Sequence, residues 1–143
     1  MEQTKEGYTL TDDNVRMDVK AIHALLIATY WAGSRTLEAT EKSVKSSICF
    51  GVFHDGRQAG FARVVTDGAV FSWLCDVVVD EAHRGKGLGK WLLEAALAHP
   101  DVQGTEVILR TRGTEKLYAR YGFEYFDEGL SWMGIKENRP SCA

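Results

Sequence analysis

A glycine-rich segment, His83–Lys90, carries the residues best suited to chemistry in this 143-residue chain. It reads His-Arg-Gly-Lys-Gly-Leu-Gly-Lys, and it lies between an apolar, strand-like run and a helix-like repeat. The first N–H groups of that helix would point outward without partners, and the helix dipole would add positive potential. Glycine also lets a ligand approach the backbone closely. The segment therefore predicts a loop that binds a phosphate or a pyrophosphate.

Three nucleotide-binding patterns can be compared with this segment. The P-loop spacing, Gly-x-x-x-x-Gly-Lys-Ser/Thr, does not occur in the sequence. The dinucleotide pattern Gly-x-Gly-x-x-Gly/Ala fails as well, because its last position falls on Lys90 or Leu92. A third pattern, Arg/Gln-x-x-Gly-x-Gly/Ala, is matched by Arg84, Gly87 and Gly89. The alternative is a glycine-rich turn that binds no ligand.

An acidic residue, Asp76, lies inside the apolar run Trp73–Val79. Burying a carboxylate alone is costly, so the side chain must face a cleft or find a partner. Strand alternation places Asp76 on the same face as Leu74 and Val78. We expect Asp76 to face an amine substrate, as a general base or as an anchor for a cation. The alternative is a structural carboxylate, bonded to the backbone or to Arg63.

Hydrophobic periodicity and turn residues predict the elements that position these groups. The predicted helices run from the cap Asp18 to about Trp31, over Leu37–Lys45, from Leu88 to Pro100, and over Thr114–Tyr121. The predicted strands are Tyr8–Leu10, Ile48–Phe53, Gln58–Thr66, Ala69–Val79, Glu106–Arg110, Phe123–Phe126 and Ser131–Lys136. The early strands form an antiparallel meander, and a right-handed parallel βαβ unit follows. We expect one α/β domain over residues 1–143, with a flexible tail at residues 137–143.

Two segments resemble signatures of GNAT-type N-acetyltransferases. Cys75–Leu93 looks like the acetyl-CoA-binding motif of that family, and Lys116–Phe123 resembles its second signature, Leu-Tyr-x-x-x-Gly-Phe. Both occur in the family's order and at its usual separation. The resemblance implies a GNAT-like mixed, mostly antiparallel sheet flanked by helices, with a central parallel pair of strands that splay apart. It also implies an acetyl-CoA-dependent N-acetyltransferase that uses no metal.

The resemblance implies which residues bind acetyl-CoA. The backbone of Val77, Val78 and Val79 would pair with the pantetheine arm. Backbone N–H groups of the loop would hold the pyrophosphate, and the loop residues concerned are Arg84, Gly85, Lys86, Gly87, Leu88, Gly89 and Lys90. Thr111 falls where many members have an asparagine that contacts the cofactor.

Tyr118 falls on the tyrosine that usually protonates the leaving thiolate in this family. A phenol with a reference pKa of about 10 is a sensible proton donor to a thiolate. Tyr121 is the alternative donor. For the base, deprotonation of the amine through a chain of water molecules stays open beside Asp76. Cys75 could form an acyl-cysteine, but a buried strand cysteine is the favoured interpretation.

The acceptor side is predicted at the cluster Tyr30, Trp31 and Arg35, beside the end of the first helix. Aromatic side chains there could line the pocket, and Arg35 could contact a carboxylate of the acceptor. The alternative is an aromatic core with a surface arginine. The expected acceptor is a primary amine of a small molecule or peptide, attacked directly in a ternary complex. The rival function is a non-catalytic module that binds acyl-CoA.

Composition narrows the remaining classes. Hydrophobic residues make up 45% and charged residues 26%, and the net charge is −3, so a nucleic-acid binder is disfavoured. No apolar run has the ~20 residues of a membrane helix. Three cysteines without a CxxC pair and no signal peptide favour a reducing, cytoplasmic setting. The four histidines show no metal-ligand spacing. A homodimer stays open.

Overall fold

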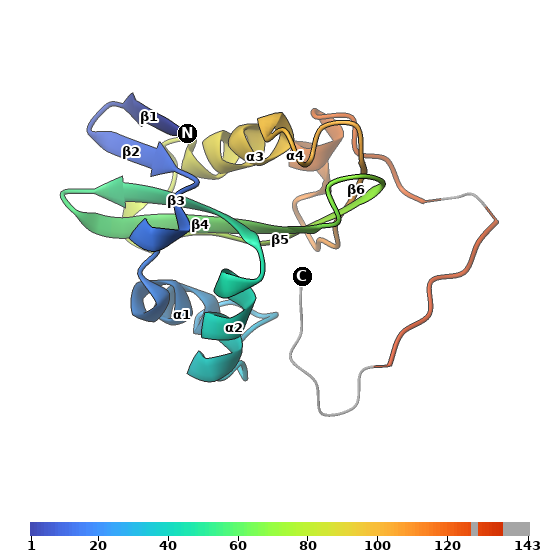
Figure 1. The fold of residues 1–143 in the computed structure, drawn as a ribbon, viewed down its shortest axis with the longest axis horizontal. Coiled ribbons are helices and arrows are strands. Elements are labelled where there is room, and N and C mark those ends of the chain that lie inside the picture. The colour runs from blue at the N-terminus through green and yellow to red at the C-terminus, as the bar shows by residue number, and fades with distance from the viewer. Residues whose placement is uncertain (127–128, 136–143) are drawn as a thin grey trace.

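The computed structural model describes residues 1–126 and 129–135 of the chain. Six strands form one sheet in the order β1-β2-β3-β4-β5-β6 (Figure 1). The strands are β1 (Glu2–Lys5), β2 (Tyr8–Thr11), β3 (Ile48–His54), β4 (Arg57–Thr66), β5 (Phe71–Val79) and β6 (Glu106–Ile108). The helices are α1 (Val19–Ile27), α2 (Leu37–Lys45), α3 (Leu88–Ala98) and α4 (Glu115–Ala119), with 3-10 turns η1 (Asn14–Arg16) and η2 (Glu81–His83). The α/β class with a mixed, mostly antiparallel sheet is confirmed.

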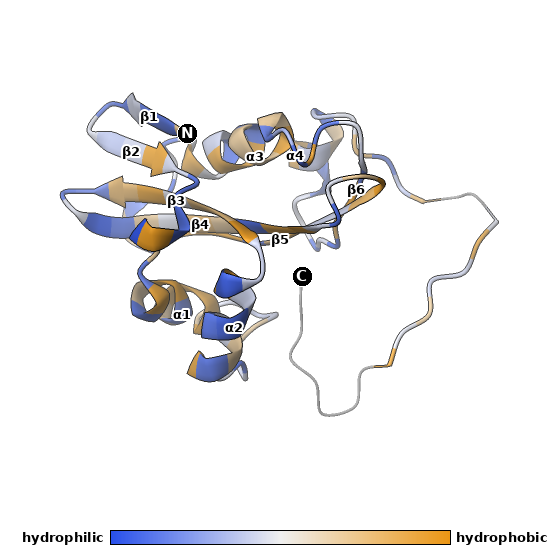
Figure 2. Cartoon of the chain, in the orientation of Figure 1, coloured by the Kyte–Doolittle hydropathy of each residue, from blue (hydrophilic) through white to orange (hydrophobic). Residues whose placement is uncertain are grey.

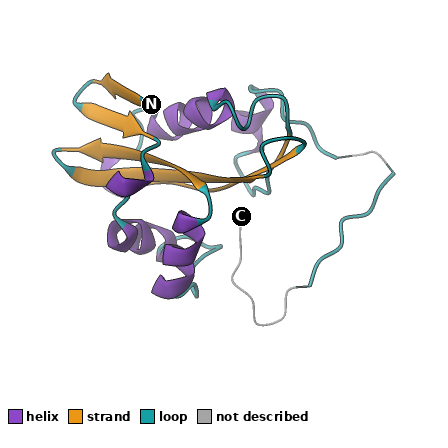
Figure 3. Cartoon of the chain, viewed as in Figure 1, coloured by secondary structure: helices purple, strands orange, loops and turns teal. Residues whose placement is uncertain are grey.

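The first five strands pair antiparallel with their sequence neighbours, and β6 pairs parallel with β5 (Figure 3). The strand β1 is missing from the sequence prediction. Its four side chains are all exposed and polar or charged, so no apolar alternation marks it. Glu6 and Gly7, with φ of 50° and 83°, make the two-residue turn that returns the chain into β2.

Several predicted elements are longer than the observed ones, among them β6, which ends at Ile108, and α4, which spans Glu115–Ala119. In two further cases, α1 and β5, a side chain ends the regular backbone. The helix α1 stops at Ile27 and does not extend to Trp31. At its end, the Thr29 hydroxyl donates to the Leu26 carbonyl oxygen at 2.6 Å. The strand β5 begins at Phe71, not at Ala69. The carboxylate of Asp67 accepts N–H groups from residues 69, 70 and 71 and holds them in a turn.

The predicted strands at the C-terminal end are wrong for the residues described. Residues 123–126 and 131–135 have no strand structure, and Lys136 lies outside the described residues. They have no partner strand among the described residues, and most of their apolar side chains are exposed, for example Tyr125 at 85% and Met133 at 92%. In the described sheet the parallel pair therefore lies at the edge. The expected tail, residues 137–143, lies outside the description.

Helices cover both faces of the sheet (Figures 1 and 2). The apolar face of α3 is buried on one side, with Leu88, Leu92 and Leu93 packed in the main core against β3, β4 and β5. On the other side, Ile22 and Leu26 of α1 pack in a second core that also contains Cys49, Phe61 and Val78. Both Cys49 and Cys75 are buried free cysteines, as expected.

No helix within residues 1–126 and 129–135 combines the length and the apolar character that crossing a bilayer requires. A cytoplasmic location stays a prediction.

Candidate active site

The glycine-rich loop joins the end of β5 to the start of α3. Gly85 and Gly87 both have a φ of 77°, and a Cβ added at either would meet nothing within 4 Å. Gly87 is the N-cap of α3, and its cap makes no side-chain hydrogen bond. The N–H groups of the first helical turn, at Leu88, Gly89 and Lys90, therefore have no side-chain cap to satisfy them. An open glycine cradle at an uncapped helix N-terminus fits a pyrophosphate.

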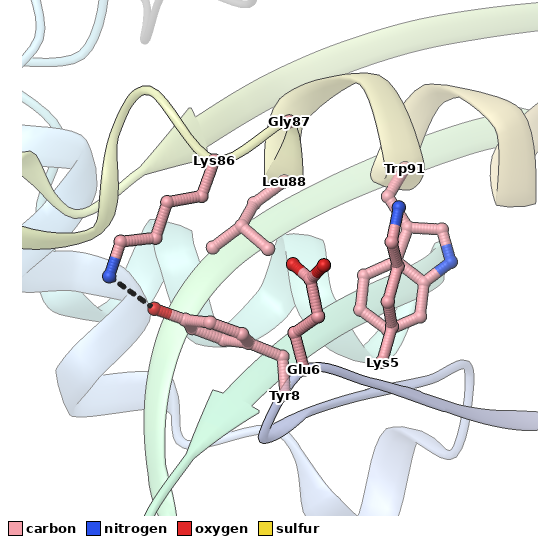
Figure 4. A pocket seen from close by; sticks show the side chains of 7 residues that line it. All are labelled: Lys5, Glu6, Tyr8, Lys86, Gly87, Leu88 and Trp91. Atoms are coloured by element: carbon pink, nitrogen blue, oxygen red, sulfur yellow. Dashed lines mark hydrogen bonds between the residues drawn. The ribbon is translucent and has the colours of Figure 1, made fainter.

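The side chain of Lys86 is oriented by a tyrosine near the N-terminus. Its Nζ donates to the Tyr8 hydroxyl at 3.2 Å, and that hydroxyl pairs with His83 Nδ1 at 2.8 Å. Figure 4 shows Lys86 bent toward Tyr8 at a pocket between the β1–β2 turn and the start of α3. The pocket is lined by Lys5, Glu6, Tyr8, Lys86, Gly87, Leu88 and Trp91. The strand β2 thus positions one cation of the predicted phosphate site.

The other two predicted cations also have protein contacts. Arg84 Nε donates to the carbonyl oxygen of Val79 at 3.1 Å. The ammonium of Lys90 lies 4.0 Å from the Glu94 carboxylate, one turn along α3. Both contacts involve exposed side chains, so they hold the cations near the loop without cancelling their charge in water.

The parallel strands β5 and β6 separate shortly after they pair. Their ladder joins Phe71–Trp73 to Glu106–Ile108, whereas β5 continues to Val79. Within the described chain, the backbone of β5 beyond Trp73 has no strand beside it on the β6 side. Val77, Val78 and Val79, predicted to bind pantetheine, lie on this unpaired length, which leads directly into the glycine-rich loop.

Asp76 lies at an irregularity in β5. Its φ is 55°, unusual for a residue other than glycine, and the β4–β5 register shifts between Phe61 and Arg63. The bulge breaks the alternation that the sequence predicts: Leu74 packs in the α3-side core, whereas Val78 packs in the α1-side core. The expectation that both share one face with Asp76 is therefore wrong.

The Asp76 carboxylate is completely buried and surrounded by donors. Arg35 donates two hydrogen bonds to it, at 2.7 and 3.1 Å, and Arg63 Nε donates a third at 2.7 Å. The indole N–H of Trp31 donates a fourth, at 3.2 Å. Two guanidinium groups and an indole thus surround the carboxylate with donors. This geometry favours the structural alternative stated above, with Arg63 as one partner.

The three residues predicted to line the acceptor site are linked to one another around Asp76 but differ in exposure. Arg35 is 6% exposed and paired with Asp76, so its guanidinium is directed at this buried carboxylate. Trp31 is half-buried and anchored to the same carboxylate. Tyr30 is 57% exposed, packs edge-on against Trp31 with ring centroids 5.0 Å apart, and lies beneath the guanidinium of Arg112 at 4.2 Å.

Tyr118 lies on α4, half-buried against the main core and in edge-on contact with Phe123. Burial, and to a lesser extent the nearby Tyr30, raises the pKa of Tyr118 above its usual 10. The hydroxyl therefore stays protonated at neutral and moderately alkaline pH.

Two further predicted positions flank Tyr118. Thr111 lies half-exposed in the loop before α4, and its hydroxyl contacts that of Thr114. The alternative proton donor, Tyr121, donates its hydroxyl to the Glu94 carboxylate at 2.8 Å, on the surface of α3. The Tyr121 hydroxyl is thus already bound to α3, which makes Tyr118 the better placed proton donor of the two.

The predicted site residues do not include Tyr8 or Arg112, and His83 appears in the prediction only as the first residue of the glycine-rich segment. Tyr8 comes from a strand 78 residues before Lys86, so no local spacing could connect them. Arg112 does carry a signal, because residues 110–120 contain four basic residues and one acid. That segment stands out in a chain with a net charge of −3.

A family model matches residues 45–125, more than half of the chain, and describes an acetyltransferase (GNAT) domain. A histone acetyltransferase of Glycine max is 28% identical over 132 residues, which cover 82% of this chain and 56% of the relative. A protein of Gibberella zeae that is named as an acetyltransferase is 31% identical over 111 residues, which cover 64% of this chain and 63% of the relative. The chain thus matches less than two thirds of the length of either relative.

Solved structures show the same similarity. A protein of Xanthomonas campestris ascribed to the GNAT family is 39% identical and has a TM-score of 0.85, covering 92% of this chain and 96% of its own. A Mycobacterium tuberculosis protein solved in complex with CoA is 23% identical, has a TM-score of 0.67, and covers 85% of this chain and 75% of its own. The second of these shows a shared fold.

Proposed function

We propose that this chain, which belongs to the GNAT acetyltransferase family, transfers an acetyl group from acetyl-CoA to a primary amine of a small molecule or peptide. The observation that carries the proposal is one continuous path along the structure. It begins at the open glycine loop, follows the unpaired backbone of β5, and leads toward α4, where Tyr118 packs partly buried against the same core as Val77 and Val79. A pyrophosphate, an extended amide-containing arm and a thioester would occupy such a path in that order.

The loop residues fit the phosphate end of acetyl-CoA. N–H groups at Leu88, Gly89 and Lys90 would hold the pyrophosphate, and the glycines at 85 and 87 would keep their Cβ positions empty for it. Lys86, directed by Tyr8, and Arg84 would add positive charge at the same place. Backbone groups of residues 77–79 would pair with the pantetheine amides, as a neighbouring strand would.

The chemical step is direct attack in a ternary complex. The neutral amine nitrogen attacks the carbonyl carbon of the thioester, the new C–N bond forms, and the C–S bond breaks. Tyr118 gives its phenolic proton to the departing sulfur and so yields the CoA thiol. The attacking nitrogen loses one proton, which returns to the phenolate of Tyr118 through solvent. The raised pKa of Tyr118 keeps the donor protonated at the start of each turnover.

In this proposal Asp76 is a positioning residue and not the base. Its carboxylate already accepts four hydrogen bonds and is 0% exposed, so neither an amine nor a water molecule can reach a free lone pair. It fixes Trp31 and Arg35, and with them the loop that carries Tyr30. The amine would lose its first proton to water at the open end of the site.

Release of free thiol from acetyl-CoA, followed in the presence of a panel of primary amines, tests the proposal. Amine-dependent thiol release, with intersecting initial-rate lines when both substrates are varied, is the expected result. Binding of acetyl-CoA without turnover on any amine would instead identify a non-catalytic module. Parallel lines, together with loss of activity in Cys75→Ala, would replace the direct step with an acyl-cysteine intermediate.

A further inference from the structure

The rim of the site beside Tyr118 is basic, although the chain as a whole is acidic. The loop between β6 and α4 carries Arg110 and Arg112, and Lys116 and Arg120 follow on and after α4. The single acid of that stretch, Glu115, accepts the N–H of Gly113 and so belongs to the loop's own turn. An acceptor approaching Tyr118 from this side would meet positive charge.

The side chain of Arg112 lies over an aromatic ring. Its guanidinium lies 4.2 Å from the ring centroid of Tyr30, within the range of a cation–π contact. A guanidinium stacked in this way offers the planar fork that matches a carboxylate or phosphate. The contact also joins two segments far apart in sequence, the loop after α1 and the loop after β6.

Tyr30 is itself fixed from beneath by buried groups. It packs edge-on against Trp31, whose indole N–H donates to Asp76, and Asp76 is held by Arg35 and Arg63. A series of contacts therefore runs from a buried ion cluster to an exposed arginine. A side chain fixed in this way loses little conformational entropy when it binds a ligand.

The arginine of this pair lies close along the chain to the proposed proton donor. Arg112 is in the loop that leads into α4, and Tyr118 is on α4 itself. An acceptor that reaches Tyr118 from the side of this loop would therefore pass Arg112 and Tyr30. The pyrophosphate loop lies elsewhere, at the N-terminal end of α3 beside the β1–β2 turn.

We propose that Arg112, stacked on Tyr30, binds an anionic group of the acceptor, so that the preferred substrates are amines that also carry a carboxylate or a phosphate. The inference rests on the proposed acetyl transfer. It assigns the acceptor selectivity to Arg112 and Tyr30, whereas Arg35 binds the buried carboxylate of Asp76. It also opposes the weak steering toward cationic acceptors that a net charge of −3 would give.

Matched pairs of amines test this selectivity. Two series serve as probes: ω-amino carboxylates of increasing chain length, each against its amide, and O-phosphoethanolamine against ethanolamine. The expected kcat/KM is roughly tenfold or more higher for the better anionic series than for its uncharged partner, since hydrogen bonds to charged groups are strong. The two series also show whether the anion is a carboxylate or a phosphate.

Variants at the two arginines of the loop separate recognition from general charge. Arg112→Gln should abolish the preference for the anion, and Arg112→Lys should lose most of it, because an ammonium lacks the fork. Arg110→Gln removes the same charge two residues away and should retain the preference. Equal effects of all three variants would reduce the result to electrostatic steering and overturn the inference. A higher KM for acetyl-CoA in Arg112→Gln, with unchanged acceptor preference, would place Arg112 on the cofactor instead.

Turnover without any anion preference would refute the inference and leave the acetyl transfer intact. If no amine turns over, the proposed function fails, and direct binding still decides the inference. O-phosphoethanolamine should then shift the Nε–H resonance of Arg112 in the CoA-saturated protein, and ethanolamine should not. Equal or absent shifts would contradict a role for Arg112 in anion binding.

Discussion

The guanidinium of Arg35 donates two hydrogen bonds to the carboxylate of Asp76, across 41 residues of sequence, in a place where both side chains are at most 3% exposed. Such a buried pair is tolerated only when it is complete, because either partner alone would be an uncompensated charge. The pair connects the loop after α1, which carries Arg35, to the bulge in β5, which carries Asp76. That loop also carries Tyr30, beside which the acceptor is proposed to bind.

Breaking this pair should destabilise the fold strongly. Arg35→Met is expected to lower the free energy of unfolding by about 3 kcal/mol, because Asp76 then keeps one guanidinium instead of two. Urea denaturation measures the change. The matched control is Arg16→Met, which breaks an exposed pair with Glu2 and should cost under about 1 kcal/mol. Equal losses in the two variants would show that the buried pair does not stabilise the fold.

Asp76→Asn should separate a positioning role from a basic one. We expect slower turnover, because Trp31 and Arg35 lose a charged acceptor, but a pH–rate profile with the same acidic limb as the wild type. An acid–base role would instead remove or shift that limb. The measurement is kcat/KM for the amine against pH, and a missing acidic limb in the variant would restore Asp76 as the base.

Gly87→Ala should weaken binding of acetyl-CoA. Alanine disfavours a φ of 77° by about 1–2 kcal/mol, so the loop would relax and its N–H groups would turn away. We expect the KM for acetyl-CoA to rise roughly tenfold, which corresponds to about 1.4 kcal/mol of binding. Gly56→Ala, at a φ of 75° in the β3–β4 turn, introduces similar strain far from the loop. The two variants should lose similar stability, but only Gly87→Ala should raise the KM for acetyl-CoA. An equal rise of this KM in Gly56→Ala would refute the phosphate-binding role of the loop.

Tyr118→Phe should lower kcat by about 10²-fold or more, the usual contribution of a general acid. The control is Tyr121→Phe, whose hydroxyl is bound to Glu94 and should be dispensable. Burial raises the pKa of Tyr118 above its usual range, so any alkaline loss of rate that depends on this phenol should begin at a higher pH than the ionisation of an exposed tyrosine. The opposite ranking of the two variants in steady-state assays would make Tyr121 the donor.

Cys49 should make the fold less stable at alkaline pH. Burial raises the pKa of its thiol to about 12, whereas the unfolded chain ionises near 9. Between these values the unfolded state loses a proton that the folded state keeps, so stability falls as pH rises, by about 1.4 kcal/mol per pH unit. Denaturation from pH 8 to 11 in wild type and Cys49→Ala checks this. The variant should lack that part of the slope, and parallel slopes would contradict it.

The sequence predicts the parts of the fold that local pattern encodes. The amphipathic repeat of α3, the Asp55-Gly56 turn and the glycine-rich loop all occur where their residues indicate. The strand β1 could not be predicted, because four exposed polar residues form it only by pairing with β2. The final strands show the converse, since apolar alternation at residues 131–135 does not suffice without a partner strand.

The candidate site divides in the same way. Tyr118 and the loop glycines come from motifs with fixed spacing, so the sequence predicts their places. The partners of Asp76 come from residues 31, 35 and 63, and a bulge decides which face the carboxylate occupies. A one-residue shift of that kind reverses strand alternation, and nothing in the local sequence announces it.

The most direct test of acetyl transfer follows the acetyl group itself. Acetyl-CoA labelled in its acetyl carbons is incubated with the protein and a panel of primary amines, and the products are identified by mass spectrometry. The account predicts a labelled amide on at least one amine, formed by the wild type and strongly reduced in Tyr118→Phe. Saturable binding of acetyl-CoA with no labelled amide on any amine would contradict it.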